Sequence, residues 1–298
     1  SFAFPGPADY ARGIIGDLGN LPGFRGGVPL GPLLEARFGC PVFINNDGDL
    51  FAYGEALGGF LPEVNAALAA AGSHRRHRNL IGLTFGTGFG GGLVRAGELV
   101  LGDNGAAGEV WLLRHRDLRD TSVEEGVSIR AVRRVYAEVA GLDPEGVPEP
   151  KVLADIARGL APGHRGAAQE AFACLGRVAG DALANALTLF DGLAVLGGGL
   201  SGAADLFMPA LLGELNGQLV GQGGHVARLE LRAHRWEDAA DRAAFLASKA
   251  VQLPVPGTDR SVAYDPVKRT AVGISSLGTS RAVGLGAWAY ALDQLDRA

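Results

Sequence analysis

The sequence predicts an α/β protein, and three observations support this prediction. Short apolar runs typical of strands alternate with longer segments of helical periodicity along the chain. The AVILMFWYC set makes up 47% of the 298 residues and charged residues 20%, which excludes a disordered chain. Glycine accounts for 47 residues, about 16% against a usual ~7%, and these glycines form short motifs between the apolar runs. We therefore expect several loops that line a ligand.

The composition excludes several other classes of protein. A net charge of −5 and a pI near 5.7 do not favour nucleic acid, which is not an expected partner. Two cysteines, Cys40 and Cys174, exclude a disulfide framework and a four-cysteine zinc site. No run approaches the roughly 18 apolar residues of a membrane span. The opening SFAFPGPADY also lacks the regions of a signal peptide. We expect a soluble, cytoplasmic protein with no membrane partner.

The first 78 residues predict a short strand-and-helix unit. Phe2 to Phe4 has the pattern of a strand end, so we expect the chain to begin inside a fold whose N-terminal part is missing. Glycines and prolines bound a strand at 41–45 and helices at 30–38, 50–57 and 63–71. The basic stretch GSHRRHR at 72–78 breaks the pattern, and we interpret it as a solvated loop rather than an anion-binding patch.

The remaining residues predict a larger α/β unit. Residues 79–101 have the pattern of a β-meander with glycine turns. Apolar runs typical of strands occur at 193–196 and 226–232. Helical patterns occur at 127–140, 167–190, 205–219, 238–251 and 281–295.

Two glycine-rich turns are candidates for nucleotide binding. The segment TFGTGFGGG at 84–92 offers backbone N–H groups and a hydroxyl in one small concavity, which suits phosphate. A tight hairpin would need the same glycines, so that alternative stays open. The segment LGGGLS at 196–201 would let a flat or phosphorylated ligand approach closely, but it is also compatible with an ordinary strand-to-helix turn.

Two carboxylates are candidates for the chemistry. Asp47 stands where a predicted strand meets a predicted helix, a place where open α/β sheets bind ligands. It could take a proton from a substrate hydroxyl, and the alternative role is a helix N-cap. Glu109 follows the small-residue turn GAAG and could accept hydrogen bonds from a polyol. The alternative for Glu109 is a solvated side chain.

Six blocks in order resemble the ROK family (repressor, open reading frame, kinase), in particular its fructokinase-like and glucokinase-like members. The resemblance extends from Ser1 to the C-terminus. The blocks are FPGPAD, GNLPG followed by PL, INNDGD, LTFGTGFGGGLV, GAAGE and VLGGGL. It implies a two-lobed actin-like ATPase (ribonuclease H-like) fold with a cleft. Residues 1–78, completed by the helix 281–298, would form the small lobe, and 79–280 the large nucleotide-binding lobe.

The resemblance also implies ligands and residue roles. ATP and Mg²⁺ would bind the large lobe and a sugar would bind between the lobes, in a homodimer. Asp47 would be the general base. The implied sugar contacts are Gly6, Asn20, Asn46, Asp47, Glu109 and Glu124, the last in VEEGVS four residues before Ser128. The implied nucleotide contacts are Thr84, Gly86, Thr87, Gly88, Gly197, Gly198 and Gly199.

Three departures from the family pattern concern the site. The Asp-x-Gly-Gly-Thr phosphate motif is absent and would lie upstream of Ser1. Leu112 stands where the family has a histidine, and we interpret His115 nearby as a surface residue and Trp111 as core packing. The cysteine-rich zinc motif is missing between residues 113 and 124. We therefore expect no structural zinc and a loop held by packing.

Taken together, the sequence predicts an ATP-dependent carbohydrate kinase acting on a hydroxyl of a hexose or amino sugar. The alternative is a non-catalytic ROK-type sugar sensor or the effector domain of a transcriptional repressor. The intact Asn46–Asp47 pair favours the kinase.

Overall fold

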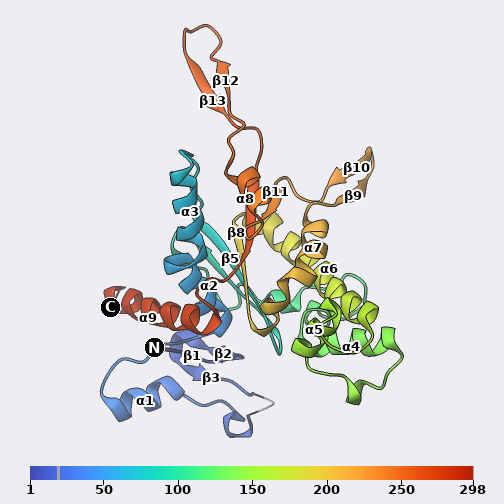
Figure 1. Cartoon of the computed structure of the whole chain (residues 1–298). Coiled ribbons are helices and arrows are strands. Elements are labelled where there is room, and N and C mark those ends of the chain that lie inside the picture. The colour runs from blue at the N-terminus through green and yellow to red at the C-terminus, as the bar shows by residue number, and fades with distance from the viewer. Residues whose placement is uncertain (19–20, 298) are drawn as a thin grey trace.

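A mixed sheet of six strands occupies the middle of the molecule in the computed structural model, which describes residues 1–18 and 21–297 (Figure 1). Its strand order is β11-β14-β8-β5-β6-β7, parallel from β11 to β5 and antiparallel from β5 to β7. The strands are β5 (Asn79–Phe85), β6 (Phe89–Arg95), β7 (Glu98–Leu99), β8 (Leu193–Gly197), β11 (Arg232–Arg235) and β14 (Arg269–Ile274). The apolar runs of β5 and β8 fit central strands buried on both faces.

Helices cover both faces of this sheet (Figure 1). Successive side chains of a strand point to opposite faces, so Ile81 and Leu83 of β5 pack on one layer and Leu80 on the other. The first layer contains α4 (Ile129–Ala140), α5 (Pro150–Arg158), α6 (Arg165–Phe190) and α7 (Ala204–Leu215). The second layer contains α2 (Asp47–Gly58), α3 (Phe60–Ala70), α8 (Ala239–Leu246) and α9 (Thr279–Arg297).

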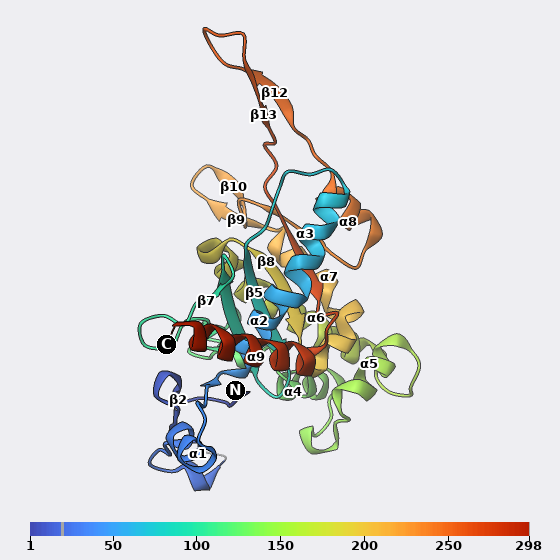
Figure 2. The ribbon, with the colours of Figure 1, turned by 90° about the vertical axis from the view of Figure 1, so that its left-hand side faces the viewer.

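The N-terminal segment forms a smaller unit with its own buried cluster of Ile15, Leu18 and Ile44. Its elements are β1 (Phe2–Ala3), β2 (Ala8–Asp9), β3 (Ile14–Ile15), α1 (Leu30–Phe38) and β4 (Ile44–Asn45). β1 pairs in parallel with β4, and α9 lies against both β1 and α2 (Figure 2). α2 and α3 share their buried cluster with β5 and β8, whereas Ile44 belongs to the cluster of the N-terminal segment.

Most predicted elements are present, and the differences are concentrated between residues 216 and 274. The strand expected at 226–232 is wrong: residues 224–227 form β10 (Gly224–Ala227), which pairs with β9 (Gln218–Gly221) in an exposed hairpin. The helix expected at 238–251 ends at Leu246, just after its buried residue Phe245. The chain then forms a second exposed hairpin of β12 (Val251–Pro254) and β13 (Ser261–Tyr264), which projects from the body (Figure 1).

No helix in the described part of the chain combines the length and the apolar character needed to cross a membrane.

Candidate active site

A cleft of about 920 Å³ opens where the N-terminal segment meets the sheet. It is lined by the turn around Gly6, the start of α2, the β5–β6 turn and the loop that carries Glu109. The predicted site residues in its lining are Gly6, Asn46, Asp47, Thr84, Gly86, Thr87, Gly88, Glu109, Glu124 and Gly198. Gly197 packs on the Phe51 ring, and neither it nor Gly199 lines the cleft. Asn20 lies outside the described residues.

Asp47 is the first residue of α2 and its side chain is exposed in the cleft. Asn46 is the N-cap of this helix: its Oδ1 accepts a hydrogen bond from the Gly48 N–H at 2.8 Å. Asn46 Nδ2 donates to the Tyr10 hydroxyl at 3.3 Å, and that hydroxyl donates to the Phe4 carbonyl at 2.9 Å. The Gly48 N–H also donates to Asp47 Oδ1 at 3.0 Å, and the exposed carboxylate can still accept further hydrogen bonds from a ligand.

The turn between β5 and β6 is a tight glycine turn that lines the cleft. The Gly86 N–H donates to the Gly88 carbonyl at 3.0 Å, which closes the turn. A Cβ on Gly86 would meet nothing within 4 Å, so the cleft is open there. A Cβ on Gly88 would lie 2.6 Å from Glu124 Oε2, so the turn and this carboxylate are in close contact.

Glu124 joins this turn to α4. Its Oε2 accepts a hydrogen bond from the Phe89 N–H at 3.0 Å, and its Oε1 lies 2.7 Å from Arg130 Nη2. Arg130 also donates to the Thr87 carbonyl at 3.2 Å. The sequence analysis missed Arg130, because only the fold brings the start of α4 beside the turn.

Gly198 follows β8 with a φ of +88°, a conformation that favours glycine. A Cβ there would lie 2.3 Å from the Phe85 carbonyl oxygen, so no larger residue fits without a shift of the backbone. Its N–H donates to Thr279 Oγ1 at 2.8 Å. Thr279 begins α9 and lines the cleft, which the sequence analysis also missed.

Glu109 lines the same cleft as Asp47 and accepts a hydrogen bond from the Trp111 indole N–H. The expectation that Trp111 is core packing is wrong. In the short turn 110–112, Val110 takes the buried position, while Trp111 is 37% exposed and Leu112 60% exposed. Both of these apolar side chains line the cleft. The cleft therefore has an apolar wall beside its carboxylates.

Two histidines are buried, among them His115, which was expected at the surface. His115 is 5% exposed because its loop folds back over α6. His234 on β11 is 6% exposed, and its Nδ1 pairs with Asp241 at 2.9 Å. Local sequence marked both as polar, whereas burial follows from segments distant in the chain.

Asp49, which was not among the predicted site residues, is a buried carboxyl group in the first turn of α2. It is 5% exposed, and its Oδ1 has no hydrogen-bond partner among residues 1–18 and 21–297. Burial, together with the nearby carboxylates of Glu109 and Asp47, raises the pKa of Asp49 to about 8. Asp49 is therefore protonated at neutral pH and adds no charge to the site.

We expect Asp49→Asn to make the protein less sensitive to rising pH. The pKa of Asp49 is about 8 when folded and near 3.9 when unfolded, so between these values only the folded state holds the proton. Wild-type stability therefore falls as pH rises through this window, by up to about 1.4 kcal/mol per pH unit. Urea unfolding at pH 5, 7 and 9 should show that the free energy of unfolding of the variant increases relative to that of wild type as the pH rises. Asp259→Asn, at an exposed position, is the matched control. Parallel pH curves for Asp49→Asn and wild type would contradict the prediction.

The fold and cleft define an actin-like ATPase fold: a central sheet between helical layers, with a glycine turn at one end of the cleft. The chain belongs to the ROK family, whose sequence model matches residues 1–250.

Individual relatives and a solved structure agree with this family. The crystal structure of a glucokinase from Parabacteroides distasonis is 54% identical, with a TM-score of 0.89, and the match covers 98% of this chain and 80% of that one. A Streptomyces coelicolor glucokinase is 31% identical over 65% of this chain and 62% of its own length. A Vibrio cholerae N-acetyl-D-glucosamine kinase is 36% identical over 37% of this chain and 32% of its own length. The chain thus spans less than two thirds of the curated relatives it matches.

Proposed function

We propose that this protein is an ATP-dependent sugar kinase that transfers the γ-phosphate to a hydroxyl of a hexose or amino sugar, with Asp47 as general base. The observation that carries the proposal is one cleft that holds an exposed carboxylate at a helix start and the Gly86–Gly88 turn. The similarity to glucokinases and to an N-acetyl-D-glucosamine kinase supports it. A cytoplasmic location and a homodimer are part of the same proposal.

The residues of the cleft fit ATP with Mg²⁺. The open space beside Gly86 and the glycine-only backbone at Gly198 would let phosphate groups approach the main chain closely. The described residues hold no group of three His, Cys, Asp or Glu side chains suited to a metal ion, so the phosphates of ATP would supply most ligands of Mg²⁺. When bound, the cation neutralises charge on the phosphate oxygens.

The protein groups divide the work of the reaction between them. Asp47 accepts the proton of the sugar hydroxyl as its oxygen attacks the γ-phosphorus and the bond to ADP breaks. Asn46 and Tyr10 hold the start of α2, and so fix where that carboxylate lies. The Gly86–Gly88 turn orients the phosphate, and Glu109 accepts hydrogen bonds from other sugar hydroxyls.

A coupled ADP-release assay on the full-length protein tests the proposal. It would use ATP, Mg²⁺ and a panel of glucose, fructose, mannose and their N-acetylated amino sugars. Turnover with one sugar that is lost in Asp47→Asn would support the kinase. Sugar binding by calorimetry without turnover would instead favour the non-catalytic sensor.

We expect Glu109→Gln to weaken sugar binding more than turnover. A hydrogen bond to a charged group contributes about 1.5–3 kcal/mol, so the sugar KM should rise by roughly 10- to 150-fold. Gln can still accept from the Trp111 indole, so the wall beside it stays in place. Steady-state kinetics with the best sugar of the panel measure this. An unchanged sugar KM would remove Glu109 from the binding site.

A further inference from the structure

The loop 113–122 connects the two segments that carry cleft carboxylates, Glu109 and Glu124. Three backbone contacts close it at its base. His115 N–H donates to the Thr121 carbonyl at 2.8 Å, Val123 N–H donates to the Leu113 carbonyl at 2.7 Å, and Arg114 forms a β-bridge with Ser122. What fixes this loop therefore also fixes the distance between the two carboxylate segments.

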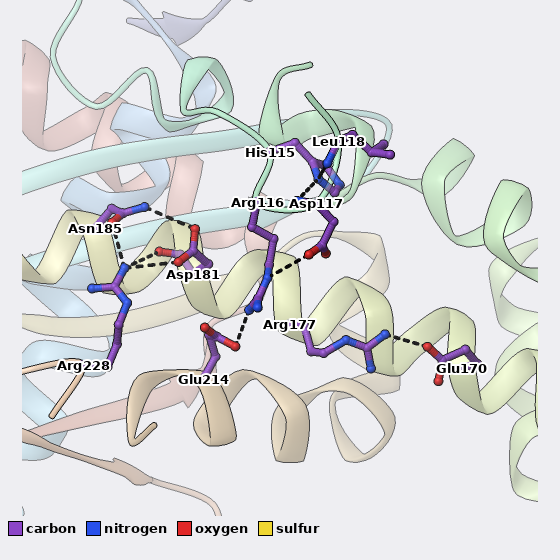
Figure 3. A network of polar contacts seen from close by, with 10 residues as sticks. All are labelled: His115, Arg116, Asp117, Leu118, Glu170, Arg177, Asp181, Asn185, Glu214 and Arg228. Atoms are coloured by element: carbon purple, nitrogen blue, oxygen red, sulfur yellow. Dashed lines mark hydrogen bonds and ion pairs between the residues drawn. The ribbon is translucent and has the colours of Figure 1, made fainter. Parts of the chain in front are cut away.

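The His115 imidazole fills the inside of the loop. Its Nδ1 accepts two backbone hydrogen bonds, from the Asp117 N–H at 3.1 Å and the Leu118 N–H at 3.0 Å (Figure 3). A ring nitrogen that accepts two N–H groups carries no proton itself, so the neutral ring has its proton on Nε2. Burial lowers the pKa of His115, which agrees with a neutral ring at pH 7.

The other side of the ring reaches the Glu124 segment and α6. A Cβ on Gly126, two residues after Glu124, would lie 2.5 Å from His115 Nε2 and 2.7 Å from a methyl group of Val178 on α6. His115 thus lies among its own loop, the Glu124 segment and a buried helix of the large core.

Arg116 fixes the same loop to α7. Its guanidinium pairs with Glu214 of α7 and with Asp117 of the loop at 3.2 Å, and both partners surround it in Figure 3. The Arg116 side chain is 31% exposed and that of Glu214 21%, so this pair is partly shielded from water. The loop is anchored to α6 and α7.

We propose that His115 is a positioning residue that sets the Glu124 segment for sugar binding, through the two hydrogen bonds accepted by Nδ1 and the contact with Gly126. This role rests on the proposed sugar kinase function. From the sequence we expected packing alone to hold this loop, whereas the hydrogen bonds of the buried His115 side chain also hold it.

Two amide substitutions distinguish the roles of the two ring nitrogens of His115. In His115→Asn the side-chain oxygen takes roughly the place of Nδ1, whereas in His115→Gln the terminal amide takes that of Nε2. We expect His115→Gln to raise the sugar KM about tenfold, with kcat and the ATP KM changed less than about twofold. We expect His115→Asn to bind the sugar nearly as tightly as wild type, because it keeps an acceptor near the position of Nδ1. His225→Gln, at an exposed position, is the control.

Amide hydrogen exchange gives a readout that needs no activity. The Asp117 and Leu118 amides should be protected in wild type and in His115→Asn, and exchange faster in His115→Gln. Arg116→Gln, which leaves the ring in place, should raise the sugar KM while these two amides stay protected.

The proposal would be overturned if His115→Asn and His115→Gln changed the sugar KM equally. It would also be overturned if a substitution lowered kcat and raised the KM for both sugar and ATP to a similar extent. If wild type binds no sugar by calorimetry, the proposed function fails and this role fails with it. If wild type binds sugar without turnover, the sugar Kd replaces KM and the same comparison decides.

Discussion

Asp47→Asn should lower kcat about 10²- to 10⁴-fold, because asparagine has nearly the shape of aspartate but cannot take the proton of the sugar hydroxyl. The helix start should survive the change. Asn46 is the N-cap of α2, and although the Gly48 N–H also donates to Asp47 Oδ1 at 3.0 Å, the side-chain oxygen of asparagine can accept the same bond. The sugar KM should therefore change much less than kcat.

The measurement is steady-state kinetics of ADP release beside a thermal melt of each variant. Asp103→Asn is the matched control, since Asp103 is exposed near the cleft but does not line it. Full turnover of Asp47→Asn with a normal melt would show that Asp47 is not the base.

Gly286→Ala should destabilise the fold by about 3 kcal/mol or more, at the upper end of the cost of overpacking. α2 and α9 cross so closely that a Cβ on Gly286 would lie 1.9 Å from the Leu50 carbonyl oxygen. The reverse contact is equally close, since a Cβ on Gly54 would lie 1.9 Å from the Ala282 carbonyl oxygen. Backbone atoms of two helices cannot yield separately, so the helices would have to move apart.

Gly284→Ala provides a sharp control for this prediction. Gly284 lies on the same helix, but a Cβ there would meet nothing within 4 Å. Alanine favours helix over glycine by about 1 kcal/mol, so this variant should be slightly more stable than wild type. Urea unfolding measures both variants. If Gly286→Ala unfolds at the wild-type urea concentration, the close crossing of α2 and α9 is wrong.

The sequence predicts those parts of the fold and site in which local pattern and tertiary environment agree. The buried runs of β5 and β8 are apolar, and this pattern predicts central strands. The Gly86–Gly88 turn directly follows β5, and Asp47 comes two residues after the short buried strand β4, so both stand at the ends of strands that the sequence predicts. The hairpin of β12 and β13 could not be found in this way, because neither strand is buried and no alternation of burial marks it.

The high glycine content is also explained differently from the expectation. Part of it lines the cleft, as at Gly86 and Gly88. Other glycines let backbones approach where no ligand is involved. A Cβ on Gly92 of β6 would lie 2.6 Å from the Gly48 carbonyl oxygen of α2, and Gly286 serves the α2–α9 crossing.

The burial of polar side chains could not be predicted from the sequence for a related reason. Whether Asp49 or His115 is buried depends on residues far away in the chain, such as Val178 beside the His115 ring. Composition and spacing carry no information on such contacts, so both residues read as ordinary polar positions.

The position of β14 in the chain determines when the central sheet can form during synthesis. This strand pairs with β8 on one side and β11 on the other, yet it follows both in the chain. A ribosome adds about 5–20 residues per second, so β8 waits roughly 4–15 s between its own synthesis and that of residue 274. During that time the nascent chain presents an apolar strand with one unpaired edge, the kind of surface that aggregates or binds chaperones. The central sheet therefore closes only after β14 has been synthesised.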